Sequence, residues 1–164
     1  MTSSHRLARD SVSPVEANTL LARARVLKLA AQSGVSIEPR LKGKNLGLLC
    51  ESLDSADAAL FRSAASELGA HVAHVRPSLT TASASQVVTH TAQVLGLLYD
   101  AVECQGMAPA LVRGIGEAAG VPVYDGIATQ RHPMAHLAEQ LDGGLSSSEN
   151  RRYVLQAALL DAIG

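Results

Sequence analysis

Two acidic side chains stand in a segment where α/β proteins often hold a phosphate. The segment D-S-A-D-A-A-L-F, Asp54 to Phe61, lies between an apolar strand-like run and a helix-like one. The first turn of a helix presents free backbone N–H groups and the positive end of the helix dipole, which together bind anions. Because Asp54 and Asp57 would repel a phosphate, we interpret Asp54 as the helix N-cap and Asp57 as a first-turn acid favoured by the dipole.

The histidines and Ser55 give little support for a metal centre or a nucleophile. His132 and His136 are four residues apart on a predicted helix, which is half of a zinc site, but no third ligand is evident. His71 and His74 fall on opposite faces of a short predicted strand, where we expect them at the surface. Ser55 has no G-x-S-x-G motif or triad pattern around it. We therefore expect no metal and no cofactor.

Composition indicates one globular domain in a reducing compartment. The chain has 164 residues, of which 47% are hydrophobic and 2% aromatic, so the core must consist of Leu, Val, Ile and Ala. Cys50 and Cys104 lie in apolar runs outside any C-x-x-C pair, and we expect two buried, reduced thiols in a cytoplasmic protein. A formal net charge of -1 argues against nucleic-acid and anionic-membrane partners. No apolar segment reaches the length of a membrane span.

The candidate residues follow strand-like runs in a regular α/β rhythm. Ser13, Pro14 and Glu16 form a capping-box pattern for a helix that runs to about Gln32 and stops at Gly34. The predicted strands are Asn45–Cys50, His71–Val75, Tyr99–Cys104 and Val121–Asp125, and helices are predicted near 55–68, 86–97, 108–119 and 133–142. The alternation predicts a single α/β domain with a four-stranded, mostly parallel sheet and helices on both faces.

In such a sheet, ligands bind beyond the carboxyl ends of the strands. The segments to consider are therefore 51–57, 76–85, 105–107 and 126–133. The predicted domain covers residues 1–142, followed by a Gly/Ser linker at 143–148 and a closing helix at 149–164. The closing helix is apolar on nearly every side, so we expect it to be buried against the same domain or a neighbouring subunit.

Several segments together resemble a known family. They are L-K-G-K-N-L-G-L-L-C-E-S, A-Q-V-L-G-L-L-Y-D-A-V and V-P-V-Y-D-G-I-A-T-Q-R-H-P-M-A-H-L-A-E-Q-L, in that order. They resemble the N-terminal, carbamoyl-phosphate-binding domain of the aspartate/ornithine carbamoyltransferase family, nearer its ornithine branch, from about Ser13 to Leu141. The segment from Ser148 to Ile163 resembles the C-terminal helix of that family. The linker at 143–148 then stands where the family has its amino-acid-binding domain.

The resemblance implies a phosphate site whose ligands have mostly changed. The family motif S-T-R-T-R aligns with residues 54–58, so both of its arginines become alanines. The retained family positions are Ser55, His132 and Pro133. The altered positions are Asp54, Ala56, Asp57, Ala58, Ser85, Gln105 and Ala135, of which the last three stand for a neighbouring subunit's lysine, an arginine and a glutamine.

These losses favour a carbamoyltransferase-like protein without transferase activity that acts as a binding, regulatory or scaffolding oligomer. In the family this domain forms the contacts of a trimer, so a homotrimer is our first expectation, with a complex with a full-length enzyme or another protein also open. One alternative is a carbamoyltransferase subunit that still binds carbamoyl phosphate. Another is a sensor of a cationic or amine-bearing metabolite, because Asp54 and Asp57 suit a positive charge.

Overall fold

The computed structural model describes residues 12–141 and 147–164. Within them, four parallel strands form one sheet in the order β2-β1-β3-β4. The strands are β1 (Asn45–Leu49), β2 (His71–Val75), β3 (Ala101–Cys104) and β4 (Val123–Asp125). The register pairs Leu46 with Val72 and Ala101, and Val102 with Val123. The predicted parallel sheet is confirmed; the last two strands begin slightly later than predicted, and β1 ends just before Cys50.

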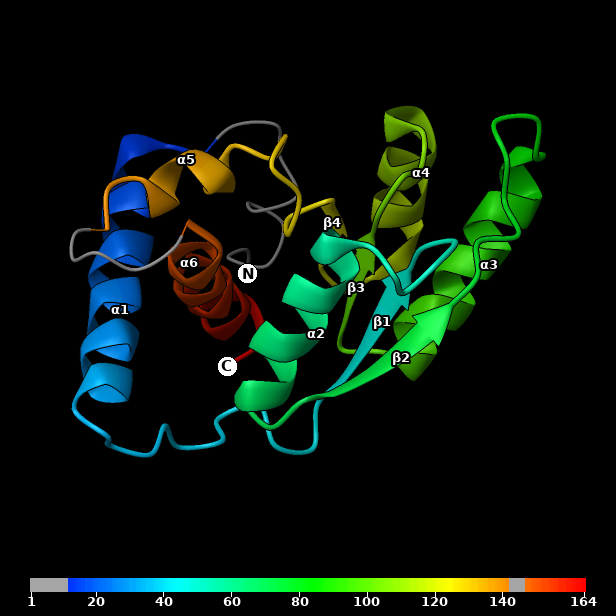
Figure 1. Ribbon diagram of the computed structural model, residues 1–164. Helices are drawn as coiled ribbons and strands as arrows, with labels where there is room; N and C mark the ends of the chain where they lie inside the picture. Colours follow the sequence, from blue (N-terminus) through cyan, green and yellow to red (C-terminus); the bar gives the residue numbers. More distant parts are fainter. Residues whose placement is uncertain (1–11, 142–146) are drawn as a thin grey trace.

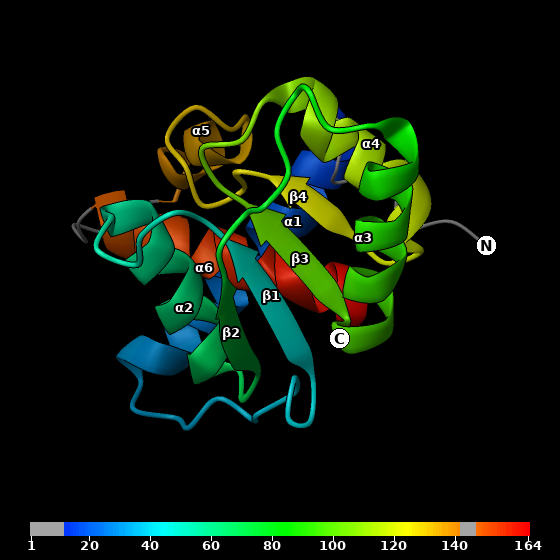
Figure 2. The ribbon, with the colours of Figure 1, turned by 90° about the vertical axis from the view of Figure 1, so that its right-hand side faces the viewer.

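Helices cover both faces of the sheet, as Figures 1 and 2 show. On one face, α3 (Ser85–Leu98) packs beside α4 (Pro109–Ala119). The other face carries α2 (Ala56–Glu67) and α6 (Ser147–Ile163), with α1 (Pro14–Gln32) packed on the far side of α6 and the short α5 (Met134–Ala138) at its end. Each face has its own cluster of buried apolar side chains.

Local sequence explains where α1 begins and ends, whereas α5 ends earlier than predicted. Ser13 caps α1 in a complete capping box with Glu16, and Gly34 follows the helix with a φ of 69°. The helix predicted at 133–142 is shorter, because the chain leaves α5 after Ala138. The N–H groups of Gln140 and Leu141 then bond three residues back rather than four, which tightens the turn and buries Leu141.

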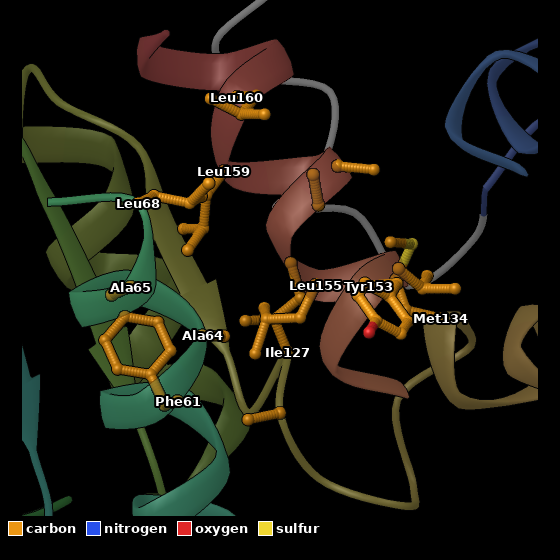
Figure 3. Packing of buried hydrophobic residues seen from close by; sticks show 14 of the residues in the cluster. Phe61, Ala64, Ala65, Leu68, Ile127, Met134, Tyr153, Leu155, Leu159 and Leu160 are labelled. Atoms are coloured by element: carbon orange, nitrogen blue, oxygen red, sulfur yellow. The ribbon is translucent and has the colours of Figure 1, made fainter. Parts of the chain in front are cut away.

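The closing helix α6 is a core element. Its residues 153–160 are all buried, and the helix lies between α1 and α2. In Figure 3, Leu159 lies against Leu68, the C-cap residue of α2, and Leu155 lies against Ile127 of the loop after β4. This agrees with the predicted burial of the helix. The linker predicted at 143–148 lies mostly outside the described residues, and α6 already includes Ser147 and Ser148.

Close packing of α3 on α4 gives a first prediction. A Cβ atom at Gly96 would lie 1.8 Å from the carbonyl oxygen of Ala119, whereas one at Gly116 would lie 3.8 Å from the nearest atom, Cβ of Val123. Gly96→Ala should therefore destabilise the protein by about 1–3 kcal/mol through overpacking. Gly116→Ala should stabilise it by about 0.5–1 kcal/mol, because alanine favours helix. Urea unfolding of both variants tests this, and equal effects would contradict the packing described.

Candidate functional site

A cavity of about 780 Å³ opens at the carboxyl edge of the sheet. Its wall combines the first turn of α2, the loop after β3 and the loop 126–133 after β4. The lining residues are Asp57, Gly106, Met107, Pro109, Asp125, Gly126, Thr129, Gln130, Arg131, His132 and Pro133. The cavity therefore lies where a parallel sheet offers a ligand site, and it brings together the predicted Asp57, His132 and Pro133.

The N-cap of α2 is Ser55 and not Asp54, so that prediction is wrong. Ser55 has extended backbone angles, and its Oγ accepts a hydrogen bond of 3.1 Å from the N–H of Ala58. Asp54 instead folds back on Ser52, with its Oδ2 accepting from Oγ of Ser52 at 3.0 Å and its N–H donating to the same Oγ at 3.1 Å. Asp57 occupies the first turn of α2, as predicted, where the helix dipole favours a carboxylate.

A guanidinium group reaches Asp57 from the closing helix. Nη2 of Arg151 on α6 lies 3.7 Å from Oδ1 of Asp57, and it also donates a hydrogen bond to the carbonyl oxygen of Ala128. The Arg151 side chain is only 11% exposed. The first turn of α2 thus has an internal ion pair in which the carboxylate faces the cavity. Sequence reasoning missed Arg151, because nothing in its local spacing links α6 to residue 57.

The other altered positions do not converge on the cavity. Ala56 is exposed, whereas Ala58 lies on the buried side of α2 and is 0% exposed. Position 58 is therefore part of the hydrophobic core. Ser85 begins α3 and lines a separate cavity of about 310 Å³ between α3 and α4. Ala135 faces a small gap between α5 and α6 that Arg151 also lines.

Gln105 is turned toward a buried carboxyl group. Its Nε2 lies 3.3 Å from Oε2 of Glu103, whose side chain is fully buried on β3. Glu103 also accepts hydrogen bonds of 3.0 Å from the backbone N–H groups of Ile127 and Ala128. Burial raises the pKa of Glu103 to about 8, although the hydrogen bonds from these amides act in the opposite direction. In the sequence, the one indication of this buried carboxyl group was a glutamate inside the apolar strand A-V-E-C.

His132 is held by its own loop. It is buried, and its Nδ1 accepts a hydrogen bond of 3.1 Å from the N–H of Met134. His132 precedes α5, whereas His136 lies within α5, is exposed and is 3.9 Å from Glu139. The prediction that the two histidines share one helix is therefore wrong. Among residues 12–141 and 147–164, no three His, Cys, Asp or Glu side chains gather closely enough to hold a metal ion.

The remaining sequence candidates lie as expected. His71 and His74 are exposed at the sheet edge, and Nε2 of His74 lies 2.7 Å from the carbonyl oxygen of Cys50. Cys50 and Cys104 are both buried and free. In the part of the chain that the structure describes, no helix combines the length and apolar character needed to cross a bilayer.

Comparison with known proteins assigns the family. Residues 4–142 match the family model described as "Aspartate/ornithine carbamoyltransferase, carbamoyl-P binding domain". The ornithine carbamoyltransferase of Actinobacillus pleuropneumoniae serotype 5b (strain L20) is 36% identical over 137 residues, which are 84% of this chain and 41% of that protein. The chain thus spans less than half the length of the curated relatives it matches.

Solved structures agree on the fold. The ornithine carbamoyltransferase from Pyrococcus furiosus superposes with a TM-score of 0.70 at 22% identity, over 85% of this chain and 44% of that one. The catalytic subunit of M. jannaschii aspartate transcarbamoylase gives a TM-score of 0.64 at 20% identity, over 83% of this chain and 44% of that one. This chain belongs to the aspartate/ornithine carbamoyltransferase family, which it matches through the carbamoyl-phosphate-binding domain.

Proposed function

We propose that this chain is a non-catalytic member of the carbamoyltransferase family that acts as a binding or scaffolding subunit in an oligomer. The observation that carries the proposal is the ion pair between Asp57 and Arg151 at the first turn of α2. A carboxylate of the chain itself lies at the cavity where the family would hold a phosphate, and it forms an ion pair with the guanidinium group of Arg151.

The loss of hydrogen-bond donors to the phosphate determines how tightly we expect carbamoyl phosphate to bind. Ala56, Ala58 and Gln105 replace three arginines of the family pattern, and the Gln105 amide donates to Glu103. A hydrogen bond to a charged group is worth roughly 1.5–3 kcal/mol, so three lost bonds cost at least about 4.5 kcal/mol. This corresponds to about a thousandfold weaker binding, before the repulsion from Asp57 is counted.

The same losses bear on catalysis. Transfer of a carbamoyl group requires its carbonyl to be polarised and the attacking amine to be positioned. With the phosphate unanchored, neither requirement is met at this cavity. We expect no formation of citrulline from ornithine, or of carbamoyl aspartate from aspartate, above the rate without protein. Turnover by the pure protein would overturn the proposal.

Calorimetry with an Asp57→Asn variant tests the role of the internal carboxylate. The wild-type protein should give no heat with millimolar carbamoyl phosphate. Asp57→Asn removes the repulsion and releases Arg151, so we expect binding to strengthen at least about tenfold, which is about 1.4 kcal/mol. Asp54→Asn is the matched control, because Asp54 faces Ser52 and does not line the cavity. Equal responses of the two variants would contradict a local effect of Asp57.

A second candidate function is recognition of an amine-bearing metabolite. Two carboxylates, Asp57 and Asp125, line the cavity together. Ornithine, arginine and spermidine titrated under the same conditions test it. Heat with one of these compounds that Asp57→Asn abolishes would favour a sensor, and no heat with any of them would leave partner binding.

Assembly is supported by an apolar stripe on α3. Val87, Val94, Leu97 and Leu98 are 52%, 39%, 86% and 59% exposed, and the first, second and fourth lie on one face of the helix. Such a surface is typical of an interface. A homotrimer, the assembly that the family resemblance favours, would bury it.

Replacement of one apolar residue tests the assembly. A lysine at position 98 would place a charge in the proposed interface, where leaving it unpaired is costly. We expect Leu98→Lys to reduce the mass measured by light scattering to that of a single chain of 17.0 kDa. Leu29→Lys on α1, where the leucine is 65% exposed, should leave the mass unchanged. A monomeric wild-type protein, or an effect of both variants alike, would argue against the α3 interface.

A further inference from the structure

The loop 126–132 forms much of the cavity wall. The N–H of Gly126, its first residue, donates to the carbonyl oxygen of Cys104 on β3 at 2.8 Å, and the backbone bonds that follow are local. Gly126 leaves β4 with a φ of 66°, and Thr129 donates to the carbonyl oxygen of Gly126 through both its N–H and its Oγ1. The N–H of His132 donates to the carbonyl oxygen of Thr129 at 3.3 Å. Beyond Gly126, these local bonds shape the loop but do not fix it to the sheet.

Two side chains from other elements fix the loop at its middle. From β3, Glu103 accepts from the N–H groups of Ile127 and Ala128, and from α6, Arg151 donates to the carbonyl oxygen of Ala128. The peptide groups on both sides of Ala128 are thereby bound to different parts of the fold. In Figure 3, Ile127 projects from this loop toward Leu155 of α6.

Glu103 performs this task from inside an apolar cluster. Side chains alternate along a strand, so Glu103 shares a face of the sheet with Ala101, and its sheet neighbours are Leu48 and Tyr124. All three neighbours belong to the cluster beneath α2 and α6. The hydrogen-bond partners of the Glu103 carboxyl group are backbone amides and the Gln105 amide.

We propose that Glu103 is the positioning residue of the cavity wall, which holds loop 126–132 through two backbone amides and changes that hold when its carboxyl group takes up a proton. The proposal does not depend on which ligand the cavity accepts. It concerns the conformation of the loop that places Thr129, Arg131 and His132 in the cavity wall.

The donors and acceptors around Glu103 explain why its protonation changes the hydrogen bonds to the loop. An ionised carboxylate accepts from all three donors, whereas a protonated one must donate through one oxygen. Oε2, which faces both Ala128 and Gln105, has an acceptor within reach, because Oε1 of Gln105 has no hydrogen-bond partner among the described residues. A turn of the Gln105 amide satisfies the acid and leaves the Ala128 N–H with a weaker acceptor.

The other titratable groups in the cluster around Glu103 are expected to release their protons at higher pH than Glu103 does. Just after β1, on β4 and on β3 itself, burial raises the pKa of Cys50, Tyr124 and Cys104 above their ordinary values, which already lie above that of Glu103. The other charged side chains that act on these three residues are Asp125, Asp161, Glu51 and Arg62. Arg151 of α6 contacts the carbonyl oxygen of Ala128. Glu103 is therefore the group expected to set the midpoint.

Backbone amide NMR of the full chain from about pH 5 to about pH 10 tests the proposal. The amide signals of Ile127 and Ala128 should shift together with a midpoint at about 8, and those of Thr129 and Arg131 should follow them. Glu103→Gln should abolish this titration, while Glu117→Gln, on the exposed side of α4, should leave it unchanged.

The outcomes are decisive in either direction. Signals of Ile127 and Ala128 that stay fixed over this range, or that titrate at the ordinary glutamate value, would overturn the proposal. A midpoint that persists in Glu103→Gln would assign the effect to another group and also overturn it. If Glu103→Gln does not fold, the side-chain carboxyl carbon of Glu103 in the wild-type protein should give the same midpoint as the two amides, and a different midpoint would again count against it.

Discussion

Between about pH 5 and about pH 7, Glu103 alone should lower the free energy of unfolding of the wild-type protein by roughly 3 kcal/mol. The folded protein holds a proton on Glu103 up to a pKa of about 8, whereas the unfolded chain releases it near the ordinary value of 4.5. A rise in pH therefore favours the unfolded state. The stabilisation is complete below the ordinary value and is lost as the pH passes through the raised one.

Urea unfolding at several pH values measures this slope. The expected contribution is about 1.4 kcal/mol for each pH unit per proton, and Glu103→Gln should remove it because an amide does not titrate. Other groups add their own slopes, so the comparison is between the wild-type protein and each variant. Glu117→Gln serves as the surface control. Parallel stability curves for the wild-type protein and Glu103→Gln would contradict the raised pKa of Glu103.

Truncation of a buried leucine in the closing helix should cause a large loss of stability. Leu159 is 0% exposed and lies against Leu68 in Figure 3. Leu159→Ala removes buried methyl groups and leaves a cavity, which typically costs about 2–5 kcal/mol. The midpoint of thermal unfolding should fall by several degrees for each kilocalorie lost.

A second leucine supplies the control for this experiment. Leu97 on α3 is 86% exposed, and Leu97→Ala should change the stability of the isolated chain by no more than about 0.5 kcal/mol. If Leu159→Ala were as mild as Leu97→Ala, α6 would not be part of the core in solution. Hydrogen exchange of the α6 amides would then be fast in the wild-type protein as well.

The sequence was sufficient for the fold because its signals were periodic and local. Ser13 and Glu16 define the start of α1 through a capping box, and the alternation of apolar strands and helices specifies a parallel sheet. The end of α5 was misplaced, because its last turn depends on how Leu141 packs in the tertiary structure. Asp54 was misplaced because two adjacent residues, Asp54 and Ser55, are both good N-caps and only backbone geometry separates them.

The candidate site was harder to predict from the sequence, because the residues that interact in it are far apart in the chain. Asp57 and His132 were identified at strand ends, but the ion pair with Arg151 joins residues that no local pattern connects. Glu103 gives a local signal, since a carboxyl group in an apolar strand requires a buried partner. Its partners, the amides of Ile127 and Ala128, carry no side-chain signature and become visible only with the backbone in place.

The position of α6 between α1 and α2 has a consequence for how the chain acquires its structure. The bond between Lys28 and Asn150 joins residues 122 positions apart, so the two helices can meet only after all of the intervening chain has been synthesised. Contacts of such high sequence separation slow folding. During translation the apolar sides of α1 and α2 remain uncovered, and a chaperone that shields them would have its greatest effect in that interval.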